Sequence, residues 1–380
     1  MIYLDYAATT KPSEKTLNIM RETCLNYPGN PSSLHSLGID ARKQYNTLKK
    51  SLATSLNTTV KNIIITSTGT EAINHAIKGT FFKHKDKTIL TSTIEHHASI
   101  NALNFVKNQG GKVIEIPVDS EGFLDLEVLK ETLKTHDVSL LTLIHANNEI
   151  GTIQPIEKIK SILNEAGVLL HLDMVQIPAH QIVDFKALDV DFASFSAHKF
   201  YGPRGVGLLY VKNPNALESL IHGGKQENAL RAGTENLSGL AGMEHALKES
   251  WSNIEQKESI INDLASYFLD TLDALNVDYY LNGPPLGNQR LNSVLNIGFK
   301  NIDNQDLSFA LNEEGIYVST GSACHSDQIE PSHVLKAINT PEEYLCGCIR
   351  FSFSHKESYE TLKKTATIIK RLIDSGDFEQ

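Results

Sequence analysis

Cysteine is scarce in this chain. Only four cysteines occur among its 380 residues, namely Cys24, Cys324, Cys346 and Cys348. They form no CxxC pair and no zinc-binding spacing, which argues against a cysteine-held zinc site, and no other metal site is predicted. Few and scattered cysteines fit a protein of the reducing cytoplasm.

Long apolar runs and an excess of positive charge are also missing. No apolar stretch approaches the length that spans a membrane, and the segment Met1 to Tyr6 carries Asp5 but no basic cluster, so no signal peptide is expected. A net charge of −10 argues against a broad surface for nucleic acid or anionic membrane. We therefore expect a cytoplasmic protein that binds neither directly.

The composition that remains is that of an ordinary globular protein, 41% hydrophobic and 21% charged, with length enough for a large core and two domains. Between residues 60 and 212, short apolar runs alternate with amphipathic helical stretches. This alternation predicts an α/β fold with a mostly parallel, doubly wound sheet. The runs are Asn62–Thr66, Thr88–Ser92, Lys112–Ile116, Leu140–Ile144, Val168–Leu172, Asp191–Phe195 and Gly207–Val211.

Polar clusters follow directly after several of these runs. Doubly wound sheets bind ligands at the carboxyl ends of their strands, so we expect the clusters to gather in one crevice. They are Ser67–Thr70, Glu95–His97, Asn147–Glu149, Asp173 with Gln176, and Ser196–Lys199.

The pattern changes after Val211. A polar, glycine-containing loop, Ile221–Asn236, precedes helical periodicity from about Leu237 to Leu275. The rest predicts a smaller α+β domain against which the extended N-terminus packs. We place the large domain at residues 13–260 and the small domain, with the Cys324 loop, at residues 1–12 and 261–380. Its expected strands are Asn292–Gly298 and Cys346–Ser354, and its expected helices are Asp303–Glu314, Pro331–Ala337 and Glu357–Asp374.

Lys199 is the most informative single residue. It stands between the end of an apolar run and a Gly-Pro turn, Gly202–Pro203. A lysine buried there beside cationic or apolar groups loses its proton and becomes nucleophilic. Its neutral amine can form a Schiff base with an aldehyde, as in enzymes that use pyridoxal 5′-phosphate (PLP). For a lysine taken alone, pairing with a carboxylate is the commoner interpretation, so other residues must decide.

Two other strand ends carry groups that PLP would need. Thr68–Glu71 precedes a helix expected to begin near Ala72, where free N–H groups and the helix dipole favour a phosphate, although the same residues also fit a simple helix cap. Asp173 ends an apolar strand, where a carboxylate is either buried and paired or catalytic. Such a carboxylate can keep the pyridine nitrogen of PLP protonated, and Gln176 can reach the phenolic oxygen.

His96 and Arg350 are weaker candidates. The ring of His96 can stack on a cofactor and carry protons near neutral pH, but a structural histidine is the more usual interpretation, and His97 has no assigned role. Arg350 alternates with apolar residues, so we expect it on the polar face of a half-buried strand. There it can hold a substrate carboxylate bidentately or form a surface salt bridge.

Cys324 lies in Ser319–Asp327, a small and polar segment that predicts an exposed loop. Structural cysteines prefer apolar surroundings. A cysteine in such a loop is therefore a candidate nucleophile, with an incidental thiol as the alternative. We interpret Cys346 and Cys348 as structural or incidental.

Taken in order, these segments resemble the group I cysteine desulfurases, the NifS/IscS type within the class V aminotransferase-like PLP enzymes. The likeness extends nearly from end to end. Each motif alone is weak, but the whole set at matching intervals is specific. The motifs are Tyr3–Thr10, Asn30–His35, Thr66–Glu71, Glu95–His96, Asn147–Gly151, His171–Asp173 with Gln176, Ser196–Lys199, Arg231–Asn236, Gly321–Cys324 and Ile349–Ser352.

The resemblance implies a homodimeric PLP-dependent transferase of fold type I that converts L-cysteine to L-alanine. It makes Lys199 the Schiff-base lysine and the base at Cα, Cys324 the sulfur acceptor that becomes a persulfide, and His96 a stacking residue and proton carrier. It also implies that the phosphate is bound by Gly69, Thr70, Ser196, His198 and a second subunit's Thr234. Asp173 would contact the ring nitrogen, and Gln176 and Asn148 the phenolic oxygen. The substrate carboxylate would be bound by Asn148 and Arg350.

Three residues depart from the usual pattern of that family. Ala197 and Thr68 stand where glycine is common, and Lys225 interrupts the glycine run after His222. These positions concern backbone space near the phosphate and the dimer edge. We expect them to affect cofactor affinity and dimer detail rather than the chemistry.

Other functions stay open on the sequence alone. A lyase acting on selenocysteine, or another class V aminotransferase, would share most of these residues. A non-enzymatic interaction subunit would keep only the fold, and the intact Lys199, Asp173 and Cys324 argue against it.

The sulfur acceptor is also open. Relatives that serve an iron–sulfur scaffold carry an extra C-terminal segment that helps dock the scaffold, and little follows the last expected helix here. We therefore expect a dedicated acceptor, such as a tRNA-thiolating enzyme, rather than a scaffold. Because this chain is acidic, the acceptor would bind the tRNA.

Overall fold

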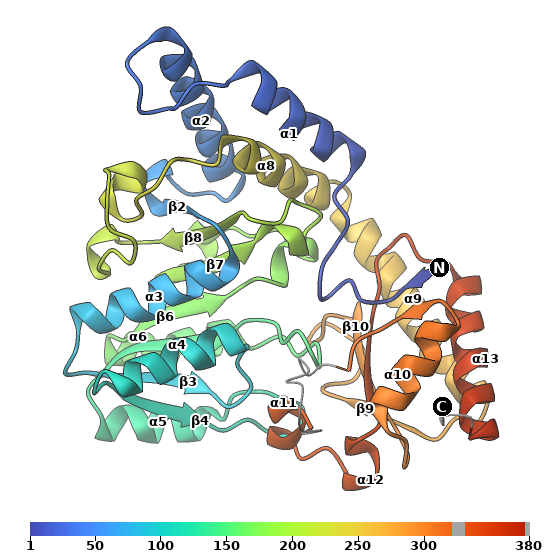
Figure 1. Cartoon of the computed structure of the whole chain (residues 1–380). Coiled ribbons are helices and arrows are strands. Elements are labelled where there is room, and N and C mark those ends of the chain that lie inside the picture. The colour runs from blue at the N-terminus through green and yellow to red at the C-terminus, as the bar shows by residue number, and fades with distance from the viewer. Residues whose placement is uncertain (321–330, 377–380) are drawn as a thin grey trace.

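A mostly parallel sheet of seven strands forms the centre of the fold in the computed structural model, which describes residues 1–320 and 331–376 (Figure 1). Only β8 runs antiparallel to its neighbours in this described sheet, so the predicted α/β class is confirmed. In spatial order the strands are β2 (Ile63–Thr66), β8 (Gly207–Val211), β7 (Phe192–Ser196), β6 (Leu169–Asp173), β5 (Val138–Ile144), β3 (Thr88–Ser92) and β4 (Lys112–Ile116).

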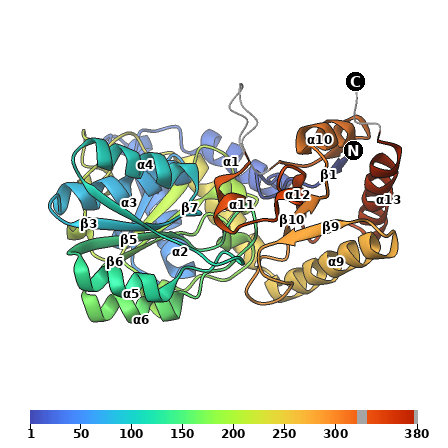
Figure 2. The ribbon, with the colours of Figure 1, turned by 90° about the horizontal axis from the view of Figure 1, so that it is seen from below.

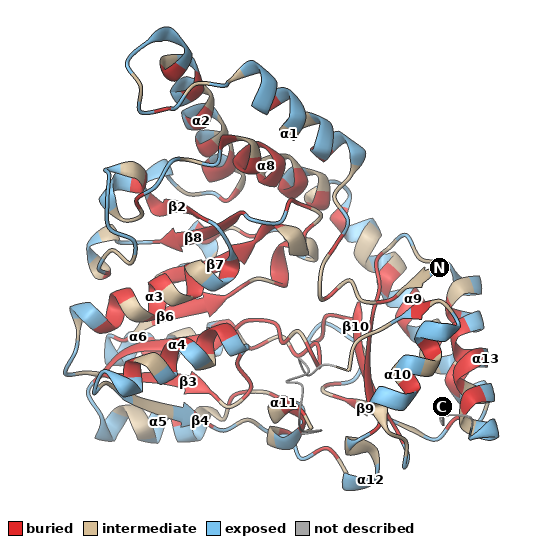
Figure 3. Ribbon diagram, viewed as in Figure 1, coloured by how far each residue is buried: buried red, intermediate tan, exposed pale blue. Residues whose placement is uncertain are grey.

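Helices cover both faces of this sheet, with α3 and α4 on one side and α5 and α6 on the other (Figure 2). Every residue of β5 is buried, as Figure 3 shows for the inner strands, whereas the edge strand β4 is only partly buried. Burial on both faces explains why the inner strands are continuous apolar runs. The helices of this part are α1 (Glu14–Asn26), α2 (Ser36–Ser55), α3 (Gly69–Lys83), α4 (His97–Asn108), α5 (Leu126–Thr135), α6 (Ile156–Ala166), α7 (Phe185–Leu188) and α8 (Leu237–Trp251).

The smaller part is built on an antiparallel sheet in the order β12–β10–β9 and a two-stranded parallel pair, β1 with β11. Its strands are β1 (Ile2–Tyr3), β9 (Tyr279–Asn282), β10 (Val294–Phe299), β11 (Ile316–Tyr317) and β12 (Cys348–Ser352). Its helices are α9 (Ile254–Ala274), α10 (Asn304–Glu313), α11 (His333–Ala337), α12 (Glu342–Leu345) and α13 (Tyr359–Ser375).

The extended N-terminus packs against this smaller part, as expected. Ile2 pairs with Ile316, and the N–H of Ala7 donates to Ser352 Oγ at 2.9 Å. Leu4 is fully buried in an apolar cluster that also holds residues of α9, β10, β12 and α13. Ile261 is the first residue of α9 in that cluster, so we propose that the domain boundary lies near residue 260.

The helical periodicity expected from 237 to 275 is confirmed, and it is divided into two helices because Asn253 adopts a left-handed conformation (φ 56°) between α8 and α9. One expectation about local structure is wrong. The strand around Arg350 is not half-buried, since every residue of β12 is buried. No helix among residues 1–320 and 331–376 is long and apolar enough to cross a bilayer.

Candidate active site

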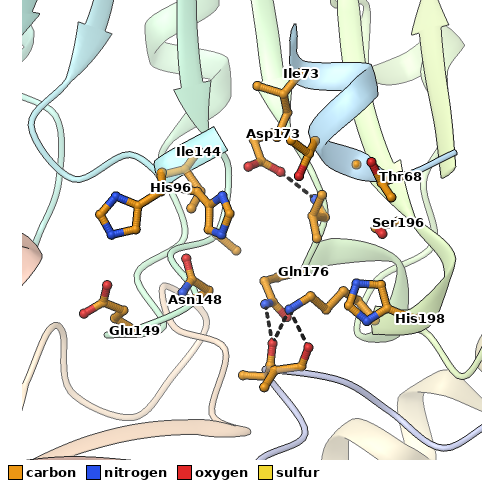
Figure 4. Close-up of a pocket in the computed structure, with 18 of the residues that line it drawn as sticks. Thr68, Ile73, His96, Ile144, Asn148, Glu149, Asp173, Gln176, Ser196 and His198 are labelled. Carbon is orange, nitrogen blue, oxygen red and sulfur yellow. Dashed lines mark hydrogen bonds between the residues drawn. The ribbon is translucent and has the colours of Figure 1, made fainter. Parts of the chain in front are cut away.

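A cavity of about 440 Å³ lies at the carboxyl ends of the parallel strands (Figure 4). All five polar clusters named above contribute residues to its wall, so the expectation that one crevice gathers them is confirmed. The smaller part closes the cavity with Ala7, Ala8, Ser319, His333 and Arg350.

Lys199 ends a 3₁₀ turn, Ala197–Lys199, that begins where β7 stops. Its Nζ donates to the carbonyl oxygens of Ala7 (2.6 Å) and Ala8 (2.9 Å), and no ion pair with a carboxylate occurs among the described residues. Burial and the nearby Arg350 lower the pKa of Lys199 to about 8, although Asp173 and Asp5 act in the opposite direction. The amine is therefore far easier to deprotonate than an ordinary lysine.

Asp173 is the last residue of β6, and its carboxylate faces the cavity (Figure 4). Its Oδ1 accepts the N–H of Val175 at 3.0 Å. Burial raises the pKa of Asp173 to about 6, while the Val175 N–H and Lys199 lower it. A pKa of about 6 leaves the carboxylate mostly ionised at neutral pH, which suits a partner for a protonated ring nitrogen.

His96 caps the N-terminus of α4 and lines the cavity. Its Nδ1 accepts the N–H of Ala98 at 3.0 Å, so the neutral ring carries its proton on Nε2. Burial lowers the pKa of His96 to about 4, with further contributions from Lys199, His97 and His333. A neutral, fixed imidazole is thus a flat wall for an aromatic ligand.

The start of α3 forms an anion-binding edge. Helix α3 begins at Gly69, three residues earlier than expected, and Thr68 Oγ1 accepts the N–H of Glu71 at 3.1 Å. A Cβ on Gly69 would lie 2.8 Å from Val175 Cγ2 and 3.1 Å from Ser196 Cβ, so glycine lets the helix start approach β7 closely. Figure 4 shows Ser196 and His198 on the same side of the cavity as Thr68. Capping and anion binding are therefore compatible here.

Arg350 is buried in β12, with 6% of its side chain exposed, so the alternative of a surface salt bridge is wrong. Its Nη2 donates to Asp5 Oδ1 at 2.8 Å and its Nη1 to the carbonyl of Asn148 at 3.1 Å. The Nε–H is buried and has no hydrogen-bond partner among the described residues. An unused donor on a guanidinium that lines the cavity suits a ligand carboxylate.

Gln176 and Asn148 also line the cavity. Gln176 Nε2 donates to the carbonyl of Ala7 at 3.0 Å, the same oxygen that accepts from Lys199. Asn148 lies in the turn after β5, and Figure 4 shows it between His96 and Gln176. Both amides are thus placed where a ligand between Asp173 and Lys199 would be within their reach.

The structure does not test the roles of two site residues named from the sequence. Cys324 lies outside the described residues. Thr234 is exposed and does not line the cavity, and its role was expected in a second subunit. Among the other cysteines, burial raises the pKa of Cys348 to about 12, whereas Cys24 and Cys346 are exposed. The Cys348 thiol is therefore inert at neutral pH.

Several buried groups around the cavity were not predicted from the sequence. Burial raises the pKa of Glu149 to about 7, although Ser332 and Arg350 lower it, and burial raises that of Glu95 to about 8. Glu149 and Asp5 stood in motifs but received no role in the site. Their partners, Ser332 and Arg350, are far away in the chain, so spacing along the sequence gave no signal for them.

Comparison with known proteins identifies the family. The model of the class V aminotransferases matches residues 2–364. The cysteine desulfurase IscS of Dictyoglomus turgidum is 40% identical over 375 residues, which cover 98% of this chain and 94% of that protein. The chain belongs to the cysteine desulfurase family. The IscS of Clostridium botulinum (strain Hall) is 38% identical over 374 residues with the same coverage.

Solved structures agree with this assignment. A NifS-like protein matches with a TM-score of 0.90 at 32% identity, over 98% of this chain and 99% of that one. The NifS-like protein of Rickettsia africae matches with a TM-score of 0.87 at 30% identity and the same coverage. The resemblance seen in the motifs, the fold and the dependence on PLP are thereby confirmed.

The cavity of this cysteine desulfurase fits PLP by its donor set. It joins a lysine of lowered pKa, an ionised carboxylate and a helix start at which a glycine is sterically required. A phosphate needs such a helix start, a pyridine nitrogen needs such a carboxylate, and an aldehyde needs such an amine.

Proposed function

We propose that this chain removes sulfur from L-cysteine, giving L-alanine and a persulfide on Cys324. The observation that supports this most is the meeting of Lys199, Asp173 and Arg350 in one cavity. A PLP enzyme acting on an amino acid needs these three groups, for the aldehyde, the ring nitrogen and the substrate carboxylate.

The residues that would hold PLP all line the cavity, and the role of each comes from the family resemblance. Asp173 would contact the ring nitrogen, Gln176 and Asn148 the phenolic oxygen, and His96 the face of the ring. When bound, PLP withdraws electrons from the Cα of the amino acid and makes its proton acidic. The phosphate would be bound by Gly69, Thr70, Ser196 and His198.

Lys199 would move the Cα proton. Its lowered pKa makes the free amine available near neutral pH. The carbonyl oxygens of Ala7 and Ala8 accept hydrogen bonds from Nζ and keep the amine inside the cavity. His96, neutral and with its proton on Nε2, would carry a proton nearby.

Cys324 would accept the sulfur. Its thiolate attacks the Sγ of the substrate, a new S–S bond forms, and the Cβ–Sγ bond breaks with its electron pair left on the carbon side. Protonation of Cβ completes L-alanine. In sum, one L-cysteine and one protein thiol give one L-alanine and one persulfide, so the Cys324 sulfur is oxidised and Cβ is reduced.

Product analysis tests this function against its alternatives. The PLP-loaded protein is incubated with L-cysteine, and L-alanine, keto acids and protein-bound sulfur are measured. We expect equal amounts of alanine and bound sulfur in one turnover. Formation of a keto acid would favour an aminotransferase. Activity with L-selenocysteine but not with L-cysteine would favour a selenocysteine lyase, and the absence of cofactor absorbance would favour a non-enzymatic subunit.

Asp173→Asn is expected to slow removal of the Cα proton by about a hundredfold or more, because a neutral amide cannot keep the ring nitrogen protonated. The exchange of the Cα hydrogen of L-cysteine with heavy water measures this step directly. The melting temperature should change little. An unchanged exchange rate would refute the contact between Asp173 and the ring nitrogen.

The protein would act as a cytoplasmic homodimer, in which Thr234 of each chain reaches the phosphate bound by the other. Thr234 follows Arg231, whose Nε donates to Glu71 Oε1 at 2.8 Å in the first turn of α3. Leu25 and Leu34 on or near α1 and α2 are 64% and 85% exposed. Exposed apolar side chains of this size suit a subunit interface.

The acceptor of the sulfur would be a dedicated protein such as a tRNA-thiolating enzyme, favoured over an iron–sulfur scaffold. With a net charge of −10, this chain would leave tRNA binding to that acceptor. Transfer of labelled sulfur from L-cysteine to purified candidates tests the preference. We expect transfer to the thiolating enzyme, and efficient transfer to a scaffold alone would contradict it.

A further inference from the structure

Glu149 is a buried carboxylate in the cavity wall that the proposed reaction does not use (Figure 4). It lies in the turn after β5, and Asn147 fixes that turn by itself. Asn147 Oδ1 accepts the N–H groups of Glu149 (2.8 Å) and Ile150 (3.0 Å), while its Nδ2 donates to the carbonyl of Ile94 (2.9 Å). The carboxylate of Glu149 is therefore not needed to form the turn.

That carboxylate binds the start of α11 instead. Ser332 Oγ donates to Glu149 Oε2 at 2.6 Å and accepts the N–H of Val334 at 3.1 Å, which caps the helix. His333 Nε2 lies 2.9 Å from the carbonyl oxygen of Glu95. The first residues of α11 are thus attached to the turns after β5 and β3, both of which build the cavity.

Packing alone would hold α11 in place without a buried charge. Val334, Leu335 and Ile338 already lie in an apolar cluster with Ile94 and Ile150. A carboxylate buried there costs free energy that a hydrogen bond only offsets, and apolar replacements of buried ionic groups are often neutral or stabilising. The Glu149–Ser332 contact is therefore better explained by placement than by stability.

Further hydrogen bonds connect the neighbourhood of Glu149 with Arg350, the residue expected to bind the substrate carboxylate. Arg350 Nη1 donates to the carbonyl of Asn148, the residue before Glu149. The backbones of Arg350 and Ser319 exchange two hydrogen bonds, of 2.7 and 3.3 Å. Cys324 lies between Ser319 and Ser332 in the sequence. The chain before Cys324 is thus attached to Arg350, and the chain after it is attached to Glu149, the neighbour of Asn148.

We propose that Glu149 is a positioning residue whose hydrogen bond to Ser332 fixes the point at which the chain after Cys324 joins the cavity wall. This contact sets the approach of the Cys324 thiolate to the sulfur of a substrate held by Arg350. The inference rests on the proposed function. It predicts an effect on sulfur transfer but not on substrate binding.

Two substitutions at Glu149 separate its hydrogen bond from its bulk. Glu149→Leu removes the acceptor, whereas Glu149→Gln keeps an oxygen for Ser332. In the PLP-loaded leucine variant, we expect persulfide formation on Cys324 to slow about tenfold, while the Kd for L-cysteine from cofactor absorbance changes less than about twofold. The glutamine variant should return to within about threefold of wild type. Quenched single turnovers with mass spectrometry measure the rate.

A double-mutant cycle and a matched control complete the test. As a single substitution, Ser332→Ala should slow persulfide formation. Combined with Glu149→Leu, it should add less than about a twofold further effect, because both substitutions remove the same contact. Ser358→Ala removes the same kind of cap from α13, where Ser358 Oγ accepts the N–H of Thr361 at 3.1 Å, and should leave the rate unchanged.

A wild-type rate in Glu149→Leu, additive effects in the cycle, or an equal loss of L-cysteine binding would each overturn the inference. These results are distinct from failure of the proposed function. In that case the wild-type protein itself would form no persulfide, and the inference would fall with it.

Discussion

Replacing Lys199 by alanine is expected to reduce L-alanine formation at least about a thousandfold, even with saturating PLP. The variant lacks both the amine that bonds the cofactor aldehyde and the base at Cα. Added PLP cannot compensate, because no other lysine lines the cavity in the part of the chain that the structure describes. The measurement is alanine production from L-cysteine.

Lys212 supplies the control for this experiment. Its side chain is 47% exposed and pairs with Asp189 at 2.7 Å, outside the cavity, so Lys212→Ala should keep normal activity. Borohydride reduction of the wild-type protein should fix PLP on Lys199. Label on any other lysine would contradict the assignment.

Cys324→Ser is expected to bind PLP and L-cysteine normally but to form no persulfide, with turnover reduced at least about a hundredfold. A serine hydroxyl is not ionised at neutral pH, so it cannot replace the thiolate that attacks the substrate sulfur. Cofactor absorbance on adding L-cysteine reports binding, and alanine production reports turnover.

The other cysteines of the smaller part are the controls. Cys348 Sγ lies 3.3 Å from the carbonyl oxygen of Tyr344 and from Asn282 Nδ2, so a serine can make the same contacts. Cys346 is exposed. Cys346→Ser and Cys348→Ser should both retain most of the activity. If Cys324→Ser instead makes alanine at the wild-type rate, the nucleophile is another residue.

The large sheet could be predicted because its signal is local. The bounds of β3, β4 and β8 match the apolar runs read from the sequence, and the others differ by one or two residues. The crevice followed from the same pattern, since the carboxyl ends of parallel strands meet at one edge. The roles of its residues came from the family resemblance and stay predictions until they are tested.

The break at Asn253 is a local left-handed turn that leaves the apolar periodicity intact on both sides, so the apolar pattern did not reveal it. The error at β12 occurs where structure is not local. Strand β12 alternates like a half-buried strand, yet both of its faces are buried, because its polar face packs against the N-terminus, the turn after β5 and α11. There Asp5 meets Arg350, 345 residues away in the chain.

Glu149 shows the same limit within the site. Its partner Ser332 is 183 residues away, so no spacing rule connects them. The motif identified Glu149 as part of the family pattern, but only the folded chain shows what its carboxylate binds. Contacts of this kind decide how catalytic residues are placed, and they arise from the topology rather than from local sequence.

Mass spectrometry of the PLP-loaded protein after incubation with L-cysteine shows whether Cys324 accepts the sulfur. We expect a gain of the mass of one sulfur atom per chain, located on the peptide that contains Cys324, together with an equal amount of L-alanine. An unmodified Cys324 in a protein that still produces alanine, or sulfur bound at Cys24, Cys346 or Cys348 instead, would contradict it.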